Sequence, residues 1–243
     1  MLAGCSSGAD KASSSASSHT KYACRTINYY DYTKPVPATS DPVEDSYWQN
    51  TFFGGDSRMG SLYLYSNLRD KGAEIWYQES LSLYGIETTA MSDSGSTDTL
   101  YNLLMNNQKP NVYLMLGLNE IRNSSFQDWE AYYDEIVQEV KQKNPNVNIY
   151  LMGSYHPLAV SGLDDDQLTK QLDMVNGAMQ DIATKEHIYY YDTNDGLTDD
   201  SGKVRSDLLW DGIHFNQDGS QAFADQIARH VVKEDTYVKK VCE

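Results

Sequence analysis

The sequence has few basic residues and no long apolar run. Lysine and arginine together number 19 against 35 aspartates and glutamates, so the formal net charge of the 243-residue chain is −16. An acidic excess of this size repels nucleic-acid phosphates and anionic lipid headgroups, which argues against binding to either. No stretch approaches the roughly 18 consecutive apolar residues of a membrane-spanning helix. We therefore expect no nucleic-acid partner and no transmembrane segment.

Cysteine is also scarce. The three cysteines, Cys5, Cys24 and Cys242, lie near the two ends of the chain. None belongs to a CxxC pair or lies near a histidine at the spacing of zinc ligands. This pattern argues against a structural metal site, and we expect neither a metal nor another cofactor.

The first residues are similar to the start of a bacterial lipoprotein. Leu2-Ala3-Gly4-Cys5 resembles a lipobox, whose cysteine is lipidated after signal cleavage, although the charged and apolar regions that precede a lipobox are missing here. From Cys5 to Thr20, seven of sixteen residues are serine, a composition that cannot pack a core. We interpret residues 1–21 as a lipobox-like start and a flexible tether. The chain would then be an extracytoplasmic cell-surface lipoprotein that meets the membrane only through a lipid on Cys5; the alternative is a chance match ahead of a disordered tail.

Lipidation of Cys5 would leave an even pair of cysteines, Cys24 just before the main domain and Cys242 at its end. An extracytoplasmic compartment permits disulfides, and chain termini often lie close together at a domain surface. We therefore predict a Cys24–Cys242 disulfide, with two free thiols as the alternative.

Beyond the tether, residues 22–49 are rich in tyrosine and proline and are interpreted as an irregular arm, and residues 50–243 as one domain. In this domain, apolar runs of strand length alternate with segments of helical period. The expected strands are Thr51–Phe53, Ala73–Tyr77, Val112–Leu116, Val147–Met152 and Ile188–Tyr191. Helical periodicity is clearest from residue 125 to 140, from 167 to 184 and after Gly219. Near-continuous apolar strands between helices predict a parallel sheet covered on both faces.

Chemistry in such sheets lies beyond the carboxyl ends of the strands. The first expected strand runs into Gly54-Gly55-Asp56-Ser57-Arg58, where two glycines allow a sharp turn and Ser57 then opens a helix. The third strand ends at Gly117-Leu118-Asn119-Glu120. Far along the chain, Trp210-Asp211-Gly212-Ile213-His214 precedes the last helix. These three segments hold the candidate site residues.

Gly55-Asp56-Ser57, Gly117-x-Asn119 and Asp211-x-x-His214, in this order, resemble three sequence blocks of the SGNH (GDSL-type) hydrolase family over about residues 50–232. The resemblance implies a flavodoxin-like, three-layer α/β/α sandwich around a five-stranded parallel sheet. This agrees with the alternation of strands and helices.

The resemblance also implies a role for each residue. Ser57 would be the nucleophile, His214 its general base and Asp211 the carboxylate that orients the imidazole. A serine hydroxyl needs an adjacent base to take its proton, and that base needs a third group to fix its tautomer. The side-chain amide of Asn119 would donate to the oxyanion together with the backbone N–H of Ser57.

Two features depart from the pattern of common family members. The family's second block is a glycine whose N–H completes the oxyanion hole; Ser80 stands at the matching position, with Gly85 as the alternative, and a serine still supplies a backbone N–H. Arg58 and Glu120 replace a leucine and an aspartate. A similar GDSR and Gly-x-Asn-Glu pattern occurs in a Gram-positive extracytoplasmic lipoprotein subgroup. Both residues flank the site, so we expect an Arg58–Glu120 ion pair to support it.

The sequence therefore predicts a serine esterase that hydrolyses short acyl esters, acetyl esters above all, on extracellular or cell-wall carbohydrate through an acyl-enzyme. The carbohydrate part of this prediction depends on the tether, on the 19 tyrosines and on the family's habit rather than on any pocket residue. The alternatives are an O-acyltransferase with the same triad, a non-catalytic surface binding module on the same scaffold, and a solute-binding lipoprotein. The sequence indicates neither the acyl group and alcohol nor the oligomeric state.

Overall fold

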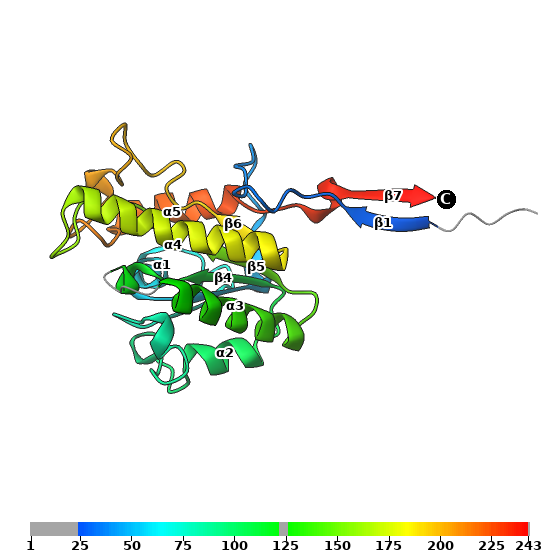
Figure 1. Ribbon diagram of the computed structural model, residues 1–243, viewed down its shortest axis with the longest axis horizontal. Coiled ribbons are helices and arrows are strands. Elements are labelled where there is room, and N and C mark those ends of the chain that lie inside the picture. Colours follow the sequence, from blue (N-terminus) through cyan, green and yellow to red (C-terminus); the bar gives the residue numbers. More distant parts are fainter. Residues whose placement is uncertain (1–23, 122–125, 243) are drawn as a thin grey trace, which may run out of the picture. The chain divides into compact units, whose positions relative to one another are not determined.

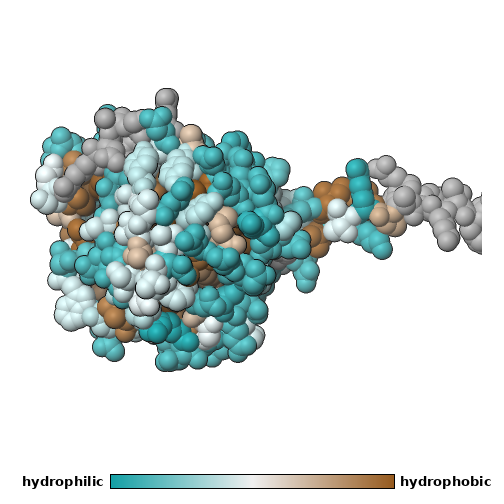
Figure 2. All heavy atoms as spheres, turned by 90° about the horizontal axis from the view of Figure 1, so that it is seen from below, coloured by the Kyte–Doolittle hydropathy of each residue, from teal (hydrophilic) through white to brown (hydrophobic). Residues whose placement is uncertain are grey.

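The computed structural model describes residues 24–121 and 126–242, and the lipobox-like start with Cys5 and the serine-rich tether lie outside them. The chain divides into two compact units, one of residues 31–232 and a smaller one that joins the residues before 31 to those from 233 onward. No described helix is both long and apolar enough to cross a bilayer. The face shown in Figure 2 is mostly hydrophilic with small apolar patches, as the acidic composition leads one to expect.

The larger unit is built on a five-stranded parallel sheet (Figure 1). Its strands are β2 (Thr51–Gly55), β3 (Glu74–Tyr77), β4 (Asn111–Met115), β5 (Asn148–Met152) and β6 (Tyr189–Tyr191). They pair in the order β3-β2-β4-β5-β6, and every pair is parallel. All residues of the central strand β4 and of its neighbour β2 are buried, as a sheet covered on both faces requires. The five expected strands and the α/β fold class are confirmed.

Helices cover both faces of this sheet (Figure 1). The α-helices of the described residues are α1 (Ser57–Tyr65), α2 (Leu100–Asn106), α3 (Phe126–Lys143), α4 (Asp165–Glu186) and α5 (Gln217–Arg229). Shorter 3-10 helices are η1 (Asp45–Asn50), η2 (Leu83–Gly85), η3 (Ser92–Ser94), η4 (Leu118–Glu120), η5 (Ser206–Leu208) and η6 (Glu234–Tyr237). Helices α2, α3 and α4 form the aliphatic core with one face of the sheet, and α1 packs against α5. The segments expected to be helical after residues 125, 167 and 219 are α3, α4 and α5.

Much of the tyrosine lies inside the larger unit. Tyr113 of β4 stacks between Phe53 of β2 and Tyr150 of β5, with ring centroids 4.9 and 4.3 Å apart. The Tyr113 hydroxyl hydrogen-bonds to that of Tyr47, 2.8 Å away, so its burial leaves no polar atom unpaired. The high tyrosine count therefore reflects core packing as well as surface.

The segment expected to be an arm outside the domain is packed against the larger unit from residue 31 onward. The Val36 N–H donates to the carbonyl of Tyr190 in β6 at 2.8 Å. The Thr39 N–H donates to the carbonyl of Arg229, at the end of α5, also at 2.8 Å. Trp48 in η1 is only 2% exposed. These contacts explain why the chain divides at residue 31 and not between residues 49 and 50.

The smaller unit contains a two-stranded antiparallel sheet of β1 (Cys24–Asn28) and β7 (Val238–Cys242), which the sequence analysis did not predict. Cys24 lies directly opposite Cys242 in the register, and Cys24 is disulfide-bonded. Directly opposite residues of an antiparallel pair have Cα atoms about 4.5–5.5 Å apart, within the range that a disulfide spans. The side chain of Cys242 is outside the described residues, so the Cys24–Cys242 bridge stays a prediction, now supported by the register.

Candidate active site

Ser57 lies beyond the carboxyl end of β2, as the first residue of α1. The Asp56 side chain caps this helix by accepting from the Arg58 N–H at 3.0 Å, and the Asp56 N–H donates to the Met115 carbonyl of β4 at 3.1 Å. A Cβ at Gly55 would lie 2.4 Å from that same carbonyl oxygen, so the close approach of β2 to β4 requires glycine there. The turn therefore holds Ser57 at the end of the sheet where the carboxyl ends of the strands lie.

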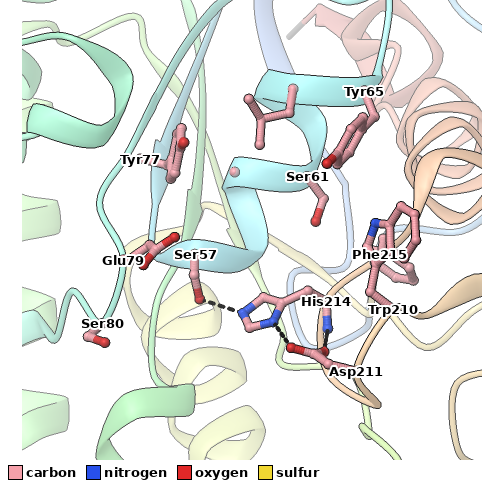
Figure 3. A pocket seen from close by; sticks show the side chains of 12 residues that line it. Ser57, Ser61, Tyr65, Tyr77, Glu79, Ser80, Trp210, Asp211, His214 and Phe215 are labelled. Carbon is pink, nitrogen blue, oxygen red and sulfur yellow. Dashed lines mark hydrogen bonds and ion pairs between the residues drawn. The ribbon is translucent and has the colours of Figure 1, made fainter.

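Ser57, His214 and Asp211 form one hydrogen-bonded chain (Figure 3). Ser57 Oγ lies 2.8 Å from His214 Nε2, and His214 Nδ1 lies 2.8 Å from Asp211 Oδ2. The turn between Asp211 and His214 is closed by Gly212, whose φ of +87° is in the left-handed region that glycine favours. The three residues predicted to form the triad thus lie within hydrogen-bonding distance of their neighbours in the chain of contacts, although 157 positions separate Ser57 from His214.

The local hydrogen bonds keep Asp211 ionised. Burial acts to raise the pKa of its carboxyl, but hydrogen bonds from the His214 N–H, the His214 ring and the Ile213 N–H together outweigh it and lower the pKa to about 2. The backbone bonds measure 2.9 Å from His214 and 3.0 Å from Ile213. An ionised Asp211 accepts from His214 Nδ1–H, which leaves Nε2 as the acceptor facing Ser57. This arrangement can remove the proton of the Ser57 hydroxyl.

Ser80 follows β3 and faces the same site as Ser57 (Figure 3). Its φ of +57° is in the left-handed region, which a serine adopts rarely and a glycine readily. Gly85 lies in η2 and lines neither of the cavities next to Ser57. The geometry therefore favours Ser80 over Gly85 as the residue at the family's glycine position. Within the described residues, the backbone N–H groups of Ser57 and Ser80 donate to no protein acceptor, so both are available to an oxyanion.

Asn119 is the third candidate donor and lies in η4, after β4. Gly117 begins this turn with a φ of +105°, and a Cβ there would meet Val175 of α4 at 2.7 Å. Asn119 Nδ2 donates one hydrogen to the Leu81 carbonyl at 2.8 Å. A carboxamide nitrogen carries two hydrogens, so the second is available to the cavity that Asn119 shares with Ser57 and Ser80.

The expected Arg58–Glu120 ion pair is not formed. Arg58 is fully buried and pairs with Asp56, since its Nε and Nη2 donate to the two carboxylate oxygens at 2.9 and 2.7 Å. Its Nη1 donates to Ser154 Oγ, beyond β5, at 2.8 Å. Arg58 follows Asp56 by two positions in the first turn of α1, which lets the guanidinium fold back onto the capping carboxylate. The expectation that the two residues flanking the site pair with each other therefore selected the wrong acid for Arg58.

Glu120 has a different role from the one expected. It is 1% exposed and accepts hydrogen bonds from the Leu83 N–H and from Trp129 Nε1, the latter at 3.3 Å. Burial raises the pKa of Glu120, whereas the hydrogen bond from Leu83 acts to lower it. With the bond from Asn119 to Leu81, the Glu120–Leu83 bond ties the loop after β3 to the turn after β4. These two loops carry two of the three candidate oxyanion donors.

Ser57 and His214 both line two cavities. The first has a volume of about 360 Å³, and around it lie Tyr65, Tyr77, Trp210 and Phe215 (Figure 3). The second, of about 310 Å³, is lined by Leu118, Asn119, Val160, Ser161 and Ile213. Trp210 is 67% and Tyr65 is 41% exposed, which is unusual for large aromatic residues. The acidic residues Glu79 and Asp211 line the first cavity, and among the described residues its lining carries no lysine or arginine.

Ser154 and Tyr155 were missed by the sequence analysis. Both follow β5 directly: Ser154 accepts from Arg58, and the buried Tyr155 hydroxyl donates to the Ile213 carbonyl between Asp211 and His214. Their position at the carboxyl end of the expected fourth strand is the signal that could have found them, because the same rule singled out the ends of the first and third strands.

Comparison with known proteins agrees with this geometry. Residues 45–222 match the model of the GDSL-like lipase/acylhydrolase family. Curated protein sequences give no significant match.

Solved structures with the same fold include three bacterial proteins. A protein from Bacteroides fragilis provisionally assigned as an acylhydrolase superposes with a TM-score of 0.57 at 12% identity, over 73% of this chain and 83% of that one. A GDSL-like lipase from Bacteroides thetaiotaomicron gives 0.54 at 11% identity, over 78% and 89%. An acetylxylan esterase from Geobacillus stearothermophilus, as a catalytic mutant, gives 0.50 at 16% identity, over 74% and 92%. The family match and the site's geometry lead to one conclusion: the chain belongs to the GDSL-like lipase/acylhydrolase family and is an SGNH serine hydrolase.

Proposed function

We propose that the protein is an extracytoplasmic serine esterase that removes short acyl groups, above all acetyl groups, from carbohydrate. The observation that carries the esterase activity is the unbroken chain from Ser57 through His214 to Asp211 beside an open cavity. A surface binding module would have no need of an aligned nucleophile, base and carboxylate, so the geometry disfavours that alternative.

The reaction follows from the positions of these groups. Ser57 Oγ attacks the carbonyl carbon of the ester while its proton passes to His214 Nε2. The negative charge that develops on the carbonyl oxygen is stabilised by the N–H groups of Ser57 and Ser80 and by Asn119 Nδ2. Collapse of this intermediate expels the alcohol, which takes the proton from His214. Water then attacks the acyl-enzyme by the same route, and Ser57 is restored with release of the acid.

The aromatic residues of the first cavity support a carbohydrate alcohol. Trp210 and Tyr65 are exposed aromatic residues that line the same cavity as His214, the residue that returns the proton to the leaving alcohol. Exposed aromatic rings combine an apolar face with a wet edge and suit a sugar ring, which has the same dual character. Glu79 and Asp211 are acidic, so the lining favours a neutral sugar over an anionic one. Because many other tyrosines are buried, this part of the proposal depends on the cavity and not on composition.

Three features support a location outside the cytoplasm. Leu2-Ala3-Gly4-Cys5 and the serine-rich segment after it are typical of a lipid-anchored protein with a tether. Cys24 is disulfide-bonded, and disulfides persist in oxidising compartments. The Arg58 and Glu120 pattern adds the resemblance to the Gram-positive lipoprotein subgroup. On this proposal the protein acts at the cell surface, anchored through Cys5.

Acetate release tests the proposal. The wild-type protein should release acetate from acetylated xylan or peptidoglycan and should cleave p-nitrophenyl acetate faster than the butyrate. Trp210→Ala should raise KM for the acetylated glycan several-fold while leaving p-nitrophenyl acetate turnover nearly unchanged. Met174→Ala, a surface change on α4 at a residue 42% exposed, serves as the control. Turnover of p-nitrophenyl acetate with no acetate from any glycan would refute the carbohydrate part. Acyl transfer to an added sugar in preference to water would instead identify an acyltransferase.

A further inference from the structure

The turn that carries the general base is exposed, and it has to hold its histidine at a fixed distance from the nucleophile. The Asp211 side chain is 56% exposed and that of His214 is 34% exposed. Two carbonyls inside this turn are nevertheless held by one neighbouring segment. The Gly212 carbonyl accepts from the Leu158 N–H at 2.8 Å, and the Ile213 carbonyl accepts from the Tyr155 hydroxyl at 2.7 Å. Both donors belong to residues 154–158, which follow β5 and are called the linking segment below.

The linking segment is joined at its other end to the nucleophile turn. Arg58, next to Ser57, donates from Nη1 to Ser154 Oγ at 2.8 Å, and its guanidinium carbon lies 5.7 Å from the ring centroid of Tyr155. Nε and Nη2 of Arg58 donate to Asp56 in the same turn. Asn176 of α4 brackets Ser154, accepting from its N–H at 2.7 Å and donating to its carbonyl at 3.0 Å. The linking segment is therefore itself held in place.

The burial of these groups makes the connection stiff. Arg58, Ser154 and Tyr155 each have essentially no exposed surface, and the Tyr155 ring also packs against Phe215, with ring centroids 4.8 Å apart. A buried guanidinium that uses three nitrogens on two partners has few alternative positions. Asp56 alone would neutralise the charge of Arg58. The bond to Ser154 therefore fixes the position of the guanidinium and is not needed to balance its charge.

From these contacts we propose that Arg58 and Tyr155 are positioning residues that hold the Asp211–His214 turn at its working distance from Ser57. The connection runs from Arg58 through Ser154 and Tyr155 to the Ile213 carbonyl. Neither residue touches the reacting atoms. The inference rests on the proposed nucleophile and base, because the connection is proposed to keep these two residues aligned. Misplacing a catalytic group by about 1 Å can lower a rate by about 100-fold.

Tyr155→Phe removes a single hydroxyl and keeps the ring beneath Arg58. We expect kcat for p-nitrophenyl acetate to fall by about 10-fold or more with KM unchanged, because only the alignment of the base is disturbed. The matched control is Tyr191→Phe. Tyr191 is also fully buried, but its hydroxyl has no hydrogen-bond partner in the described part of the chain, and its ring packs on His230, which lines neither cavity. The control should keep the wild-type kcat. Equal kcat values for the two variants, or a raised KM with unchanged kcat, would overturn the proposal.

The Arg58→Lys variant supplies a second, independent test of the connection. A lysine can pair with Asp56 but cannot at the same time present the planar set of donors that reaches Ser154. We expect a loss in kcat similar to that of Tyr155→Phe, and in the double variant a loss close to the larger single effect, because both changes break one connection. Losses that multiply in the double variant would show that the two residues act separately and would contradict a single connection.

A fluorophosphonate probe separates this inference from the proposed function. Ser57 Oγ bonds to phosphorus, fluoride leaves and the hydroxyl proton passes to His214, so the labelling rate reports activation of the serine without a glycan. Tyr155→Phe should label about 10-fold more slowly than Tyr191→Phe at matched folded fractions, measured by urea unfolding. Wild-type labelling by Tyr155→Phe would refute the positioning role while leaving the nucleophile intact. Labelling that persists in Ser57→Ala would refute the nucleophile itself, and the positioning role with it.

Discussion

Asn119→Ala should lower kcat for p-nitrophenyl acetate by about 10²–10³-fold, equivalent to about 2.7–4 kcal/mol of lost transition-state stabilisation. The Asn119 amide has two hydrogens, one of which is bonded to the Leu81 carbonyl at 2.8 Å. The other is free to meet the charge that forms on the substrate oxygen. KM should change little, because that charge is present only in the transition state.

The same substitution should cost far less in stability. The bond to Leu81 is partly buried, and the net value of one such hydrogen bond is about 0.5–1.5 kcal/mol. Asn106→Ala is a matched control: this exposed residue of α2 donates from Nδ2 to the Asn102 carbonyl at 2.9 Å and lies outside both cavities of the site. Both variants should lose similar free energy of unfolding in urea, and only Asn119→Ala should lose turnover.

Steady-state kinetics and urea unfolding of Asn119→Ala and Asn106→Ala show whether Asn119 acts on the transition state. A rise in KM with unchanged kcat would mean that Asn119 binds the ground state, and the oxyanion role would be wrong. A loss of turnover that merely follows the loss of folded protein would also contradict the reasoning, since the effect would then arise from the Leu81 bond.

Four other predictions rest on the geometry of the site, the sheet and the terminal strands. Because hydrogen bonds lower the pKa of Asp211 to about 2, its carboxylate stays ionised from about pH 5 to 9, so Asp211→Asn should lower kcat/KM by a similar factor at every pH in that range; a loss confined to one end of the range would contradict this. The lowered pKa of Asp211 also means that its contribution to stability is present above the unfolded value near 3.8 and is lost as pH falls towards about 2, which acid unfolding of Asp211→Asn and the wild type should show as a small difference. Gly55→Ala should destabilise the fold by about 1–3 kcal/mol in urea, because the new Cβ would lie 2.4 Å from the Met115 carbonyl oxygen; an unchanged midpoint would show that β2 and β4 can separate at no cost. Thiol titration of the unreduced, denatured chain should find a single free thiol, that of unlipidated Cys5, whereas three would refute the Cys24–Cys242 bridge.

The strands and the central site residues were predictable because their signals are local. An apolar run followed by Gly-Gly-Asp-Ser, or an aspartate three positions before a histidine, constrains the backbone within a few residues. The order of such segments then places them at one edge of a parallel sheet. The resemblance of these segments to three sequence blocks of the SGNH family then implied that Ser57, Asp211 and His214 form one site.

The parts that were missed depend on competition between distant groups. Arg58 was expected to pair with Glu120, but its guanidinium donates to Asp56 and to Ser154, and Ser154 lies 96 positions away. Strands β1 and β7 contain arginine, lysine and asparagine and lack the apolar pattern of the buried strands, so only their mutual pairing reveals them. The packing of residues 31–50 likewise depends on acceptors in β6 and α5 that a local reading cannot see.

The central claim, that Ser57 is the nucleophile of a serine esterase, is tested most directly by the turnover of Ser57→Ala with p-nitrophenyl acetate. Ser66→Ala, at the end of α1 and outside both cavities, provides a folded comparison with the same chemical change. We predict a loss of about 10³-fold or more in kcat for Ser57→Ala and wild-type turnover for Ser66→Ala, with similar unfolding curves for both. If Ser57→Ala kept more than about a tenth of wild-type turnover, the Ser57–His214–Asp211 chain would not be the catalytic machinery.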